Sequence, residues 1–181
     1  MPHIGVEPSC TCCADLGRVR IGRRGLLLGA GAATLRPRPV RAASGKYEAM
    51  ILGCIDPRMQ TPVRDFAVKH GLIGQYSQFT IAGAAIGAVA PAFADWHKAF
   101  WDNLATTVQL HGIAKIIAVD HRDCGAAKIA YGEDSISTPE KENATHRATL
   151  MQFRKEVGDR QPKLKIETML MALDGSIISF S

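Results

Sequence analysis

Residues 113–125 read Ile-Ala-Lys-Ile-Ile-Ala-Val-Asp-His-Arg-Asp-Cys-Gly, and this stretch decides the fold. Its first part, residues 113–119, is apolar at nearly every position, which is typical of a central parallel strand buried on both faces. His121 and Cys124 follow directly, three positions apart. One turn of chain can therefore aim an imidazole and a thiol at the same point.

A second apolar run, residues 49–52, ends in a similar way. Cys54, Asp56 and Arg58 follow it at alternate positions. In a parallel sheet, ligands bind beyond the carboxyl ends of the strands, which meet at one edge. If the two strands are neighbours, the thiol of Cys54 joins the imidazole and the thiol that follow the first strand. Two thiols and an imidazole are ligands that zinc favours, so the sequence predicts a Zn²⁺ site.

The residues leave several roles open. Asp56 could be a fourth zinc ligand that closes the site, or it could pair with Arg58 and accept a hydrogen bond from water on the metal. Without a metal, Cys54 and Cys124 could be inert buried cysteines or form a disulfide, and His121 could be a loop histidine. A cysteine hydrolase that uses Cys54 and His121 is a further alternative. The occurrence of all these groups after two strands favours zinc.

The charge of the predicted site sets an expectation for pH. Zn²⁺ with two thiolates and a neutral imidazole has a net charge near zero, whereas a site with three histidines keeps its full charge and lowers the pKa of bound water to roughly 7. The thiolate site should acidify water less. We therefore expect any hydroxide-dependent activity to rise above neutral pH.

Residues 1–43 differ in composition from the rest of the chain. They hold seven arginines against two acidic residues, which accounts for the whole net charge of +5, so the remainder is neutral. The sequence therefore gives no electrostatic reason to expect a nucleic-acid interface. The pair Arg23-Arg24 runs into a weakly apolar stretch that ends in a small-x-small pattern at Ala42, which resembles a twin-arginine export signal.

This segment predicts a periplasmic protein with no stable membrane anchor after processing. Cleavage after Ala42 or Ala43 would remove Cys10, Cys12 and Cys13 and leave two cysteines in the mature chain. We therefore assign residues 1–43 to the signal and residues 44–181 to a zinc-binding domain.

The mature chain alternates between strand and helix patterns. Strands are predicted at residues 46–53, 75–82, 113–119 and 163–173. Helices are predicted at residues 61–70, 91–111, 124–131 and 139–157, the last of them mostly exposed, and residues 83–90 form a tight connection. An apolar stripe on the second helix comprises Phe93, Trp96, Phe100, Leu104 and Val108. The alternation predicts the α/β class, with a parallel β-sheet core of about four strands flanked by helices. The histidines without a partner pattern are expected to be structural: His70, His97, His111 and His146.

At its two motifs the chain resembles the β-class carbonic anhydrases. The first is Cys-x-Asp-x-Arg from Cys54 to Arg58, and the second is His-x-x-Cys-Gly from His121 to Gly125; the resemblance covers residues 46–132 and resumes weakly at residues 171–175. It implies a β-carbonic anhydrase-like fold and a zinc lyase (a carbonate dehydratase) that interconverts CO₂ and bicarbonate through zinc-bound hydroxide.

The resemblance also implies roles for individual residues. Cys54, His121 and Cys124 would be the zinc ligands, and Asp56 and Arg58 would be the catalytic pair that orients the water or gates the metal. A homodimer or a larger homo-oligomer is implied, with the site near a subunit interface.

The chain departs from this family at three places. Residues 80–84 are Thr-Ile-Ala-Gly-Ala, where the family usually has Arg-Asn-Ala-Gly-Asn; Pro57 replaces a common serine; and Asp120 stands where a glycine is usual. The loss of polar side chains leaves two alternatives to carbonic anhydrase activity. The same zinc site could act on carbonyl sulfide or carbon disulfide, or the protein could be a non-catalytic zinc-binding protein whose fourth position Asp56 closes.

Overall fold

The structure is a computed structural model, and it describes residues 45–180. The predicted export signal lies outside these residues, so its boundary and its function stay predictions. Within the described part, no helix has both the length and the apolar character that a membrane span requires.

The described chain forms one five-stranded sheet in the order β2-β1-β3-β4-β5. The strands are β1 (Ala49–Gly53), β2 (Tyr76–Thr80), β3 (Lys115–His121), β4 (Lys165–Met171) and β5 (Ile177–Ser179). The first four are parallel, whereas β5 pairs antiparallel with β4. The predicted α/β fold with about four parallel strands is confirmed. The short fifth strand is an addition that the sequence analysis missed.

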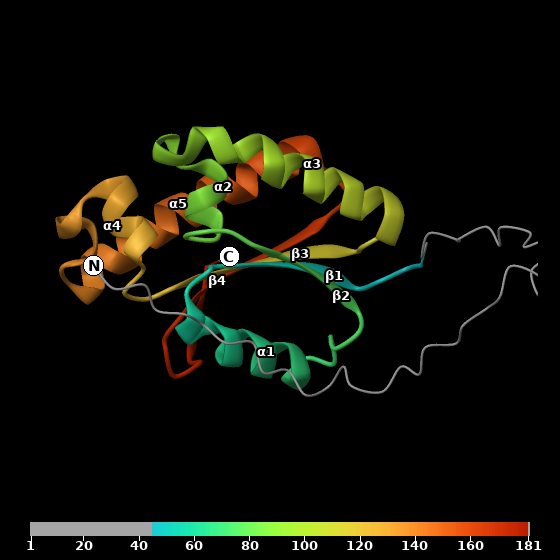
Figure 1. The fold of residues 1–181 in the computed structure, drawn as a ribbon, viewed down its shortest axis with the longest axis horizontal. Helices are drawn as coiled ribbons and strands as arrows, with labels where there is room; N and C mark the ends of the chain where they lie inside the picture. Colours follow the sequence, from blue (N-terminus) through green and yellow to red (C-terminus); the bar gives the residue numbers. More distant parts are fainter. Residues whose placement is uncertain (1–44, 181) are drawn as a thin grey trace, which may run out of the picture. The chain divides into compact units, whose positions relative to one another are not determined.

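Helices cover both faces of the sheet. They are α1 (Gln60–Lys69), α2 (Ala85–Val89), α3 (Ala94–His111), α4 (Gly125–Tyr131) and α5 (Pro139–Arg160), with 3₁₀ turns η2 (Pro57–Met59), η3 (Pro91–Phe93) and η4 (Glu133–Ile136). In Figure 1, α1 lies on one face of the sheet, and α2, α3 and α5 lie on the other. The helix α4 follows β3 beyond the carboxyl end of the strand.

The central strands are apolar on both faces because each face meets a helix layer. Along β1, Met50 and Leu52 pack in the cluster that includes residues of α2, α3 and α5. The alternate residues Ala49 and Ile51 pack in the cluster that includes residues of α1. All five residues of β1 are buried, as expected for an inner parallel strand.

Three helical segments differ from the sequence prediction. The connection at residues 83–90 contains the helix α2, in which every residue is buried. Trp96 of the predicted apolar stripe is 40% exposed, while Phe100 and Leu104 are buried. The helix α5 buries one whole face, which consists of Glu142, His146, Thr149, Leu150, Phe153 and Val157. Three of these residues are polar, so the buried face does not show as an apolar stripe in the sequence.

Candidate metal centre

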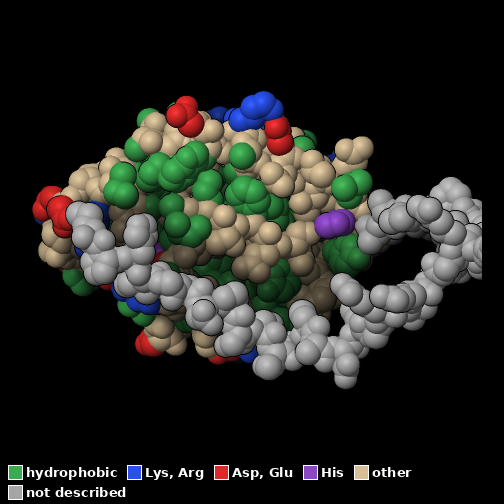
Figure 2. Space-filling view, in the orientation of Figure 1, with side chains coloured by type: hydrophobic (Ala, Val, Ile, Leu, Met, Phe, Trp, Pro, Cys, Tyr) green, Lys and Arg blue, Asp and Glu red, His purple; other side chains and the backbone are tan. Residues whose placement is uncertain are grey.

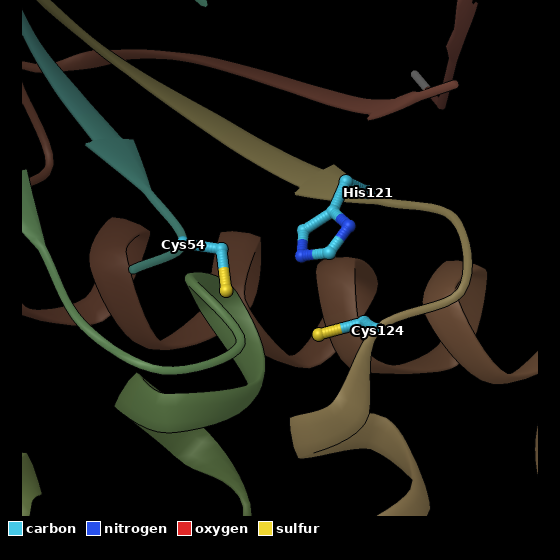
Figure 3. A group of neighbouring side chains, drawn as sticks. All are labelled: Cys54, His121 and Cys124. Atoms are coloured by element: carbon cyan, nitrogen blue, oxygen red, sulfur yellow. The ribbon is translucent and has the colours of Figure 1, made fainter. Parts of the chain in front are cut away.

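Three side chains from two loops converge at the carboxyl edge of the sheet. Cys54 directly follows β1, His121 is the last residue of β3, and Cys124 is the cap residue before α4. Because β1 and β3 are parallel neighbours, their ends meet. The two sulfurs and the ring nitrogen all lie within 4.8 Å of one another, and in Figure 3 the three side chains point toward a common centre. Donors around a tetrahedral zinc ion lie about 3.4–3.8 Å apart, so the cluster fits such an ion with little movement.

The ring of His121 presents a free lone pair to this centre. Its Nδ1 lies 2.8 Å from the carbonyl oxygen of Arg122, so Nδ1 carries the hydrogen and donates it. The opposite nitrogen, Nε2, is buried and has no hydrogen-bond partner among the described residues. A buried polar atom without a partner is rare, and a backbone carbonyl that fixes the tautomer is the usual support of a metal-binding histidine. The donor set therefore fits a metal ion.

The two thiols are unequal. A hydrogen bond from Cys124 lowers the pKa of Cys54 to about 4, although burial opposes the shift. The same hydrogen bond, together with burial, raises the pKa of Cys124 far above its usual range. Burial lowers the pKa of His121, but the charge of the nearby Cys54 sulfur and the hydrogen bond to the Arg122 carbonyl outweigh it and leave this pKa raised. Both cysteines are free, and a metal ion would have to displace the Cys124 proton to bind both sulfurs.

Arg58 joins the predicted aspartate to a second one that the sequence analysis missed. Its Nη2 lies 2.7 Å from Oδ2 of Asp56, and its Nη1 lies 2.9 Å from Oδ2 of Asp123. Hydrogen bonds from Arg58 hold the pKa of Asp56 at about 2, so this carboxylate is ionised at neutral pH. The same Oδ2 of Asp56 is 4.0 Å from Nε2 of His121. Asp56 thus pairs with Arg58 while lying beside the candidate metal position.

The surroundings of the centre are apolar on one side and open on the other. Both sulfurs pack in a small apolar cluster whose buried members include Ile86, Ala90, Phe93, Ala126 and Ala127. Beside Cys54, a cavity of about 360 Å³ has a partly polar lining that includes Gln60, Tyr76, Gln78 and Thr80.

A larger cavity of about 460 Å³ lies on the far side of Arg58, between α1 and the turn before β5. It contains none of the three donors, whereas the cavity beside Cys54 contains one of them.

A buried polar pair lies behind the centre; the sequence analysis expected His146 to be structural and did not connect it with Asp120. Oδ2 of Asp120 is 2.9 Å from Nδ1 of His146, and both side chains are completely buried. The other carboxylate oxygen, Oδ1, accepts the backbone N–H of Ala85 at 3.0 Å. The one signal in the sequence was the aspartate at a position where the resembling family has glycine. The remaining histidines make structural contacts, as expected: His70 with the Phe66 carbonyl, His97 with the Ala90 carbonyl and His111 with Ser77.

Two Rickettsia proteins are similar to this chain in sequence. No protein-family model matches the chain. It is 32% identical to the uncharacterized protein RC0076 of Rickettsia conorii over 128 residues, which cover 71% of this chain and 69% of that protein. It is 34% identical to an uncharacterized protein of Rickettsia bellii over 128 residues, covering 71% of this chain and 78% of that one.

The similar solved structures are β-carbonic anhydrases. The enzyme CafA of Aspergillus fumigatus superposes with a TM-score of 0.53 at 14% identity, covering 75% of this chain and 76% of its own. The β-carbonic anhydrase CcaA superposes with a TM-score of 0.53 at 11% sequence identity, covering 76% of this chain and 80% of its own. The Coccomyxa enzyme, solved in complex with acetazolamide, superposes with a TM-score of 0.52 at 16% sequence identity, covering 76% of this chain and 73% of its own. These likenesses show the β-carbonic anhydrase fold.

Proposed function

This chain belongs to the family of the Rickettsia conorii protein RC0076 and has the β-carbonic anhydrase fold, and from that premise we propose that it is a zinc-dependent carbonic anhydrase. One observation carries the proposal. The donor atoms of Cys54, His121 and Cys124 lie within 4.8 Å of one another at the carboxyl edge of the sheet, where a parallel sheet binds its ligands. The reaction would be the interconversion of CO₂ and bicarbonate.

The proposed roles follow from the contacts of each side chain. The two thiolates and Nε2 of His121 would hold Zn²⁺, which supplies a Lewis acid that makes bound water easier to deprotonate. Asp56 is ionised and held by Arg58, so it can accept a hydrogen bond from that water. The apolar cluster behind the sulfurs offers CO₂, which has no hydrogen to donate, a surface that excludes competing water.

A second candidate substrate keeps the same site. Four of the five residues at positions 80–84 have no polar side-chain atom, so this turn does little to favour the oxygen atoms of CO₂ over sulfur. Carbonyl sulfide and carbon disulfide are therefore the alternatives to assay. A non-catalytic zinc protein is the third possibility, because the 4.0 Å between Asp56 Oδ2 and His121 Nε2 leaves the carboxylate within a short movement of the metal position.

We also propose a homo-oligomer and export of the folded protein. Large apolar side chains are exposed near the site, among them Ile55 at 61% and Ile129 at 73%. In Figure 2, apolar side chains gather on the face shown, over the first turns of α3. Burial of such side chains against another subunit would stabilise an assembly. A twin-arginine leader would carry the chain out after folding, with zinc already protecting both thiolates from oxidation.

The test is stopped-flow CO₂ hydration by the zinc-loaded protein between about pH 7 and pH 9. We expect activity that rises with pH and disappears in Cys124→Ala and His121→Gln. The matched control is His97→Gln, because His97 is a part-buried histidine outside the donor cluster whose ring bonds to the Ala90 carbonyl, and the variant should leave the activity unchanged.

Each other outcome points to a different conclusion. A zinc-loaded protein that is inactive on CO₂ but active on carbonyl sulfide would move the assignment to the second substrate. Inactivity on both, with an exchangeable water appearing on the metal only in Asp56→Ala, would support a closed binding site. A protein that binds no zinc would overturn the proposal.

A further inference from the structure

Two completely buried polar side chains, Asp120 and His146, face each other behind the metal centre. Their Oδ2 and Nδ1 atoms are 2.9 Å apart, and neither side chain has any exposed surface. Burying such groups is costly unless they are paired, so a chain that keeps them has a use for their hydrogen bonds. His146 Nε2 has no hydrogen-bond partner among the residues described, so within that part of the chain the ring forms its hydrogen bond through Nδ1.

The second oxygen of Asp120 reaches the turn that precedes α2. It accepts the N–H of Ala85 at 3.0 Å. In this turn Gly83 and Ala84 both have positive φ, at 78° and 51°. An alanine in that region is strained and persists only where its surroundings hold it. Neither residue has a polar side-chain atom, so the turn depends on other groups for its fixation.

The turn is in direct contact with a metal-binding sulfur. The N–H of Gly83 donates to Sγ of Cys54 at 3.2 Å. Backbone hydrogen bonds fix the shape of the turn, from Ala84 to the carbonyl of Ile81 and from Ile86 to that of Gly83. The contact with Asp120 attaches the turn to β3, the strand that carries His121. A chain of hydrogen bonds therefore runs from α5 through β3 and the turn to Cys54.

We propose that Asp120 and His146 are positioning residues that hold the turn at residues 83–85 and thereby aim the Gly83 N–H at the sulfur of Cys54. The proposal rests on the proposed function, because the sulfur matters as a zinc ligand. Hydrogen bonds to a metal-bound sulfur tune the metal, and groups that orient ligands in this way typically change metal affinity 10–100-fold when removed. The polar group that the turn lacks is thus supplied by the neighbouring strand.

The test uses the full chain and four variants. Asp120→Ala and His146→Leu break the chain of hydrogen bonds. His146→Asn restores it, because the asparagine amide can donate from the position of Nδ1. The matched control is Thr168→Val on β4. It removes a buried hydrogen bond of 2.6 Å, from the Thr168 hydroxyl to the Phe180 carbonyl, and lies outside the turn.

Three measurements separate positioning from general stability. In the metal-free protein, the Gly83 amide should exchange with solvent about 10-fold faster in His146→Leu than in Thr168→Val at equal global stability. In the Co²⁺-loaded protein, the sulfur-to-cobalt absorption band should shift in His146→Leu and return in His146→Asn. Release of Zn²⁺ to a chelator should accelerate about 10-fold or more in His146→Leu and Asp120→Ala, and stay unchanged in Thr168→Val.

If Asp120→Ala does not fold, the two His146 variants carry the test. Equal Gly83 exchange, cobalt spectra and zinc release in His146→Leu and Thr168→Val would overturn the proposal. If the wild-type protein binds no metal, the proposed function fails. The Gly83 exchange still decides whether Asp120 and His146 hold the turn.

Discussion

Arg58 Nη1 lies 2.9 Å from Asp123 Oδ2 and thereby connects two loops whose residues are 65 positions apart in the sequence. The guanidinium also donates to the Asp123 carbonyl at 3.1 Å, and it binds Asp56 on its other side. One side chain therefore ties the loop after β1 to the loop after β3, and each loop carries at least one candidate zinc ligand. Both partners are largely exposed, at 44% and 56%, so the pair matters more for geometry than for stability.

The backbone of Asp123 predicts a specific order among substitutions at this position. Its φ is 55°, a region that asparagine and aspartate tolerate but β-branched residues do not. We expect Asp123→Val to lower the free energy of unfolding by about 1–2 kcal/mol through backbone strain. Asp123→Asn should keep the backbone and lose the charge, so its stability should stay close to that of the wild type. Urea unfolding of both variants checks this, and equal losses would contradict the strain argument.

The ion pair of Asp56 predicts a change in acid stability. Its pKa in the folded protein is lowered to about 2 from an ordinary value of 3.8, so the pair stabilises the fold above about pH 4. That contribution should shrink as the pH falls below about 4 and disappear below the folded pKa, at about pH 1. We expect Asp56→Asn to be less stable than the wild type at pH 6, with a difference that narrows steadily toward low pH. Thermal unfolding across this range tests the sign, and a difference that grew toward low pH would refute it.

Glu142 on α5 fastens the ligand loop to the domain. Its carboxylate accepts the N–H of Asp123 at 2.6 Å and a guanidinium hydrogen of Arg122 at 2.7 Å, and the residue is 7% exposed. Buried hydrogen bonds to charged groups contribute about 1.5–3 kcal/mol, so Glu142→Gln should cost up to that much. Glu140→Gln, on an exposed position of the same helix, should leave the unfolding midpoint nearly unchanged. Similar losses of unfolding free energy in both variants would argue against a stabilising role for the Glu142 hydrogen bonds.

Two glycines predict opposite effects of adding a methyl group. A Cβ on Gly87 in α2 would collide with the Ala82 carbonyl and approach the Ile81 side chain to 3.2 Å. We expect Gly87→Ala to destabilise by about 1–3 kcal/mol and to weaken metal binding by displacing the turn before α2. Gly158 in α5 has no neighbouring atom within 4 Å, so Gly158→Ala should stabilise the helix by up to about 1 kcal/mol. Denaturant unfolding of the two variants compares them directly.

The sequence predicted the elements whose pattern is local. The apolar residues 113–119 predicted the central strand, which the structure places at Lys115–His121. The alternation of strands and helices predicted a mainly parallel sheet, and the two motifs predicted that Cys54, His121 and Cys124 converge if their strands are neighbours, which they are. These predictions succeeded because parallel strands bring their carboxyl ends to one edge whatever the loops contain.

The features that were missed depend on contacts between distant residues. Asp120 and His146 are 26 positions apart, and no local pattern shows that the two polar side chains face each other inside the core. The same holds for Asp123, which reads as a loop residue until Arg58 is placed beside it. The sequence did not predict the helix α2, in which every residue is buried, because its Ala and Gly residues give no amphipathic period.

The neighbours β1 and β3 are separated in the chain by α1, β2, α2 and α3, and this order limits when the candidate metal centre can form. On a ribosome that adds about 5–20 residues per second, Cys54 is made on the order of ten seconds before Cys124. Non-local strand pairing of this kind also forms late in folding. If the centre holds a metal ion as proposed, all three ligands become available only after both loops have been made and β1 has paired with β3. Until Cys124 and His121 have been made, Cys54 lacks the two side-chain contacts that lower its pKa, so its thiol becomes acidic only when the two loops meet.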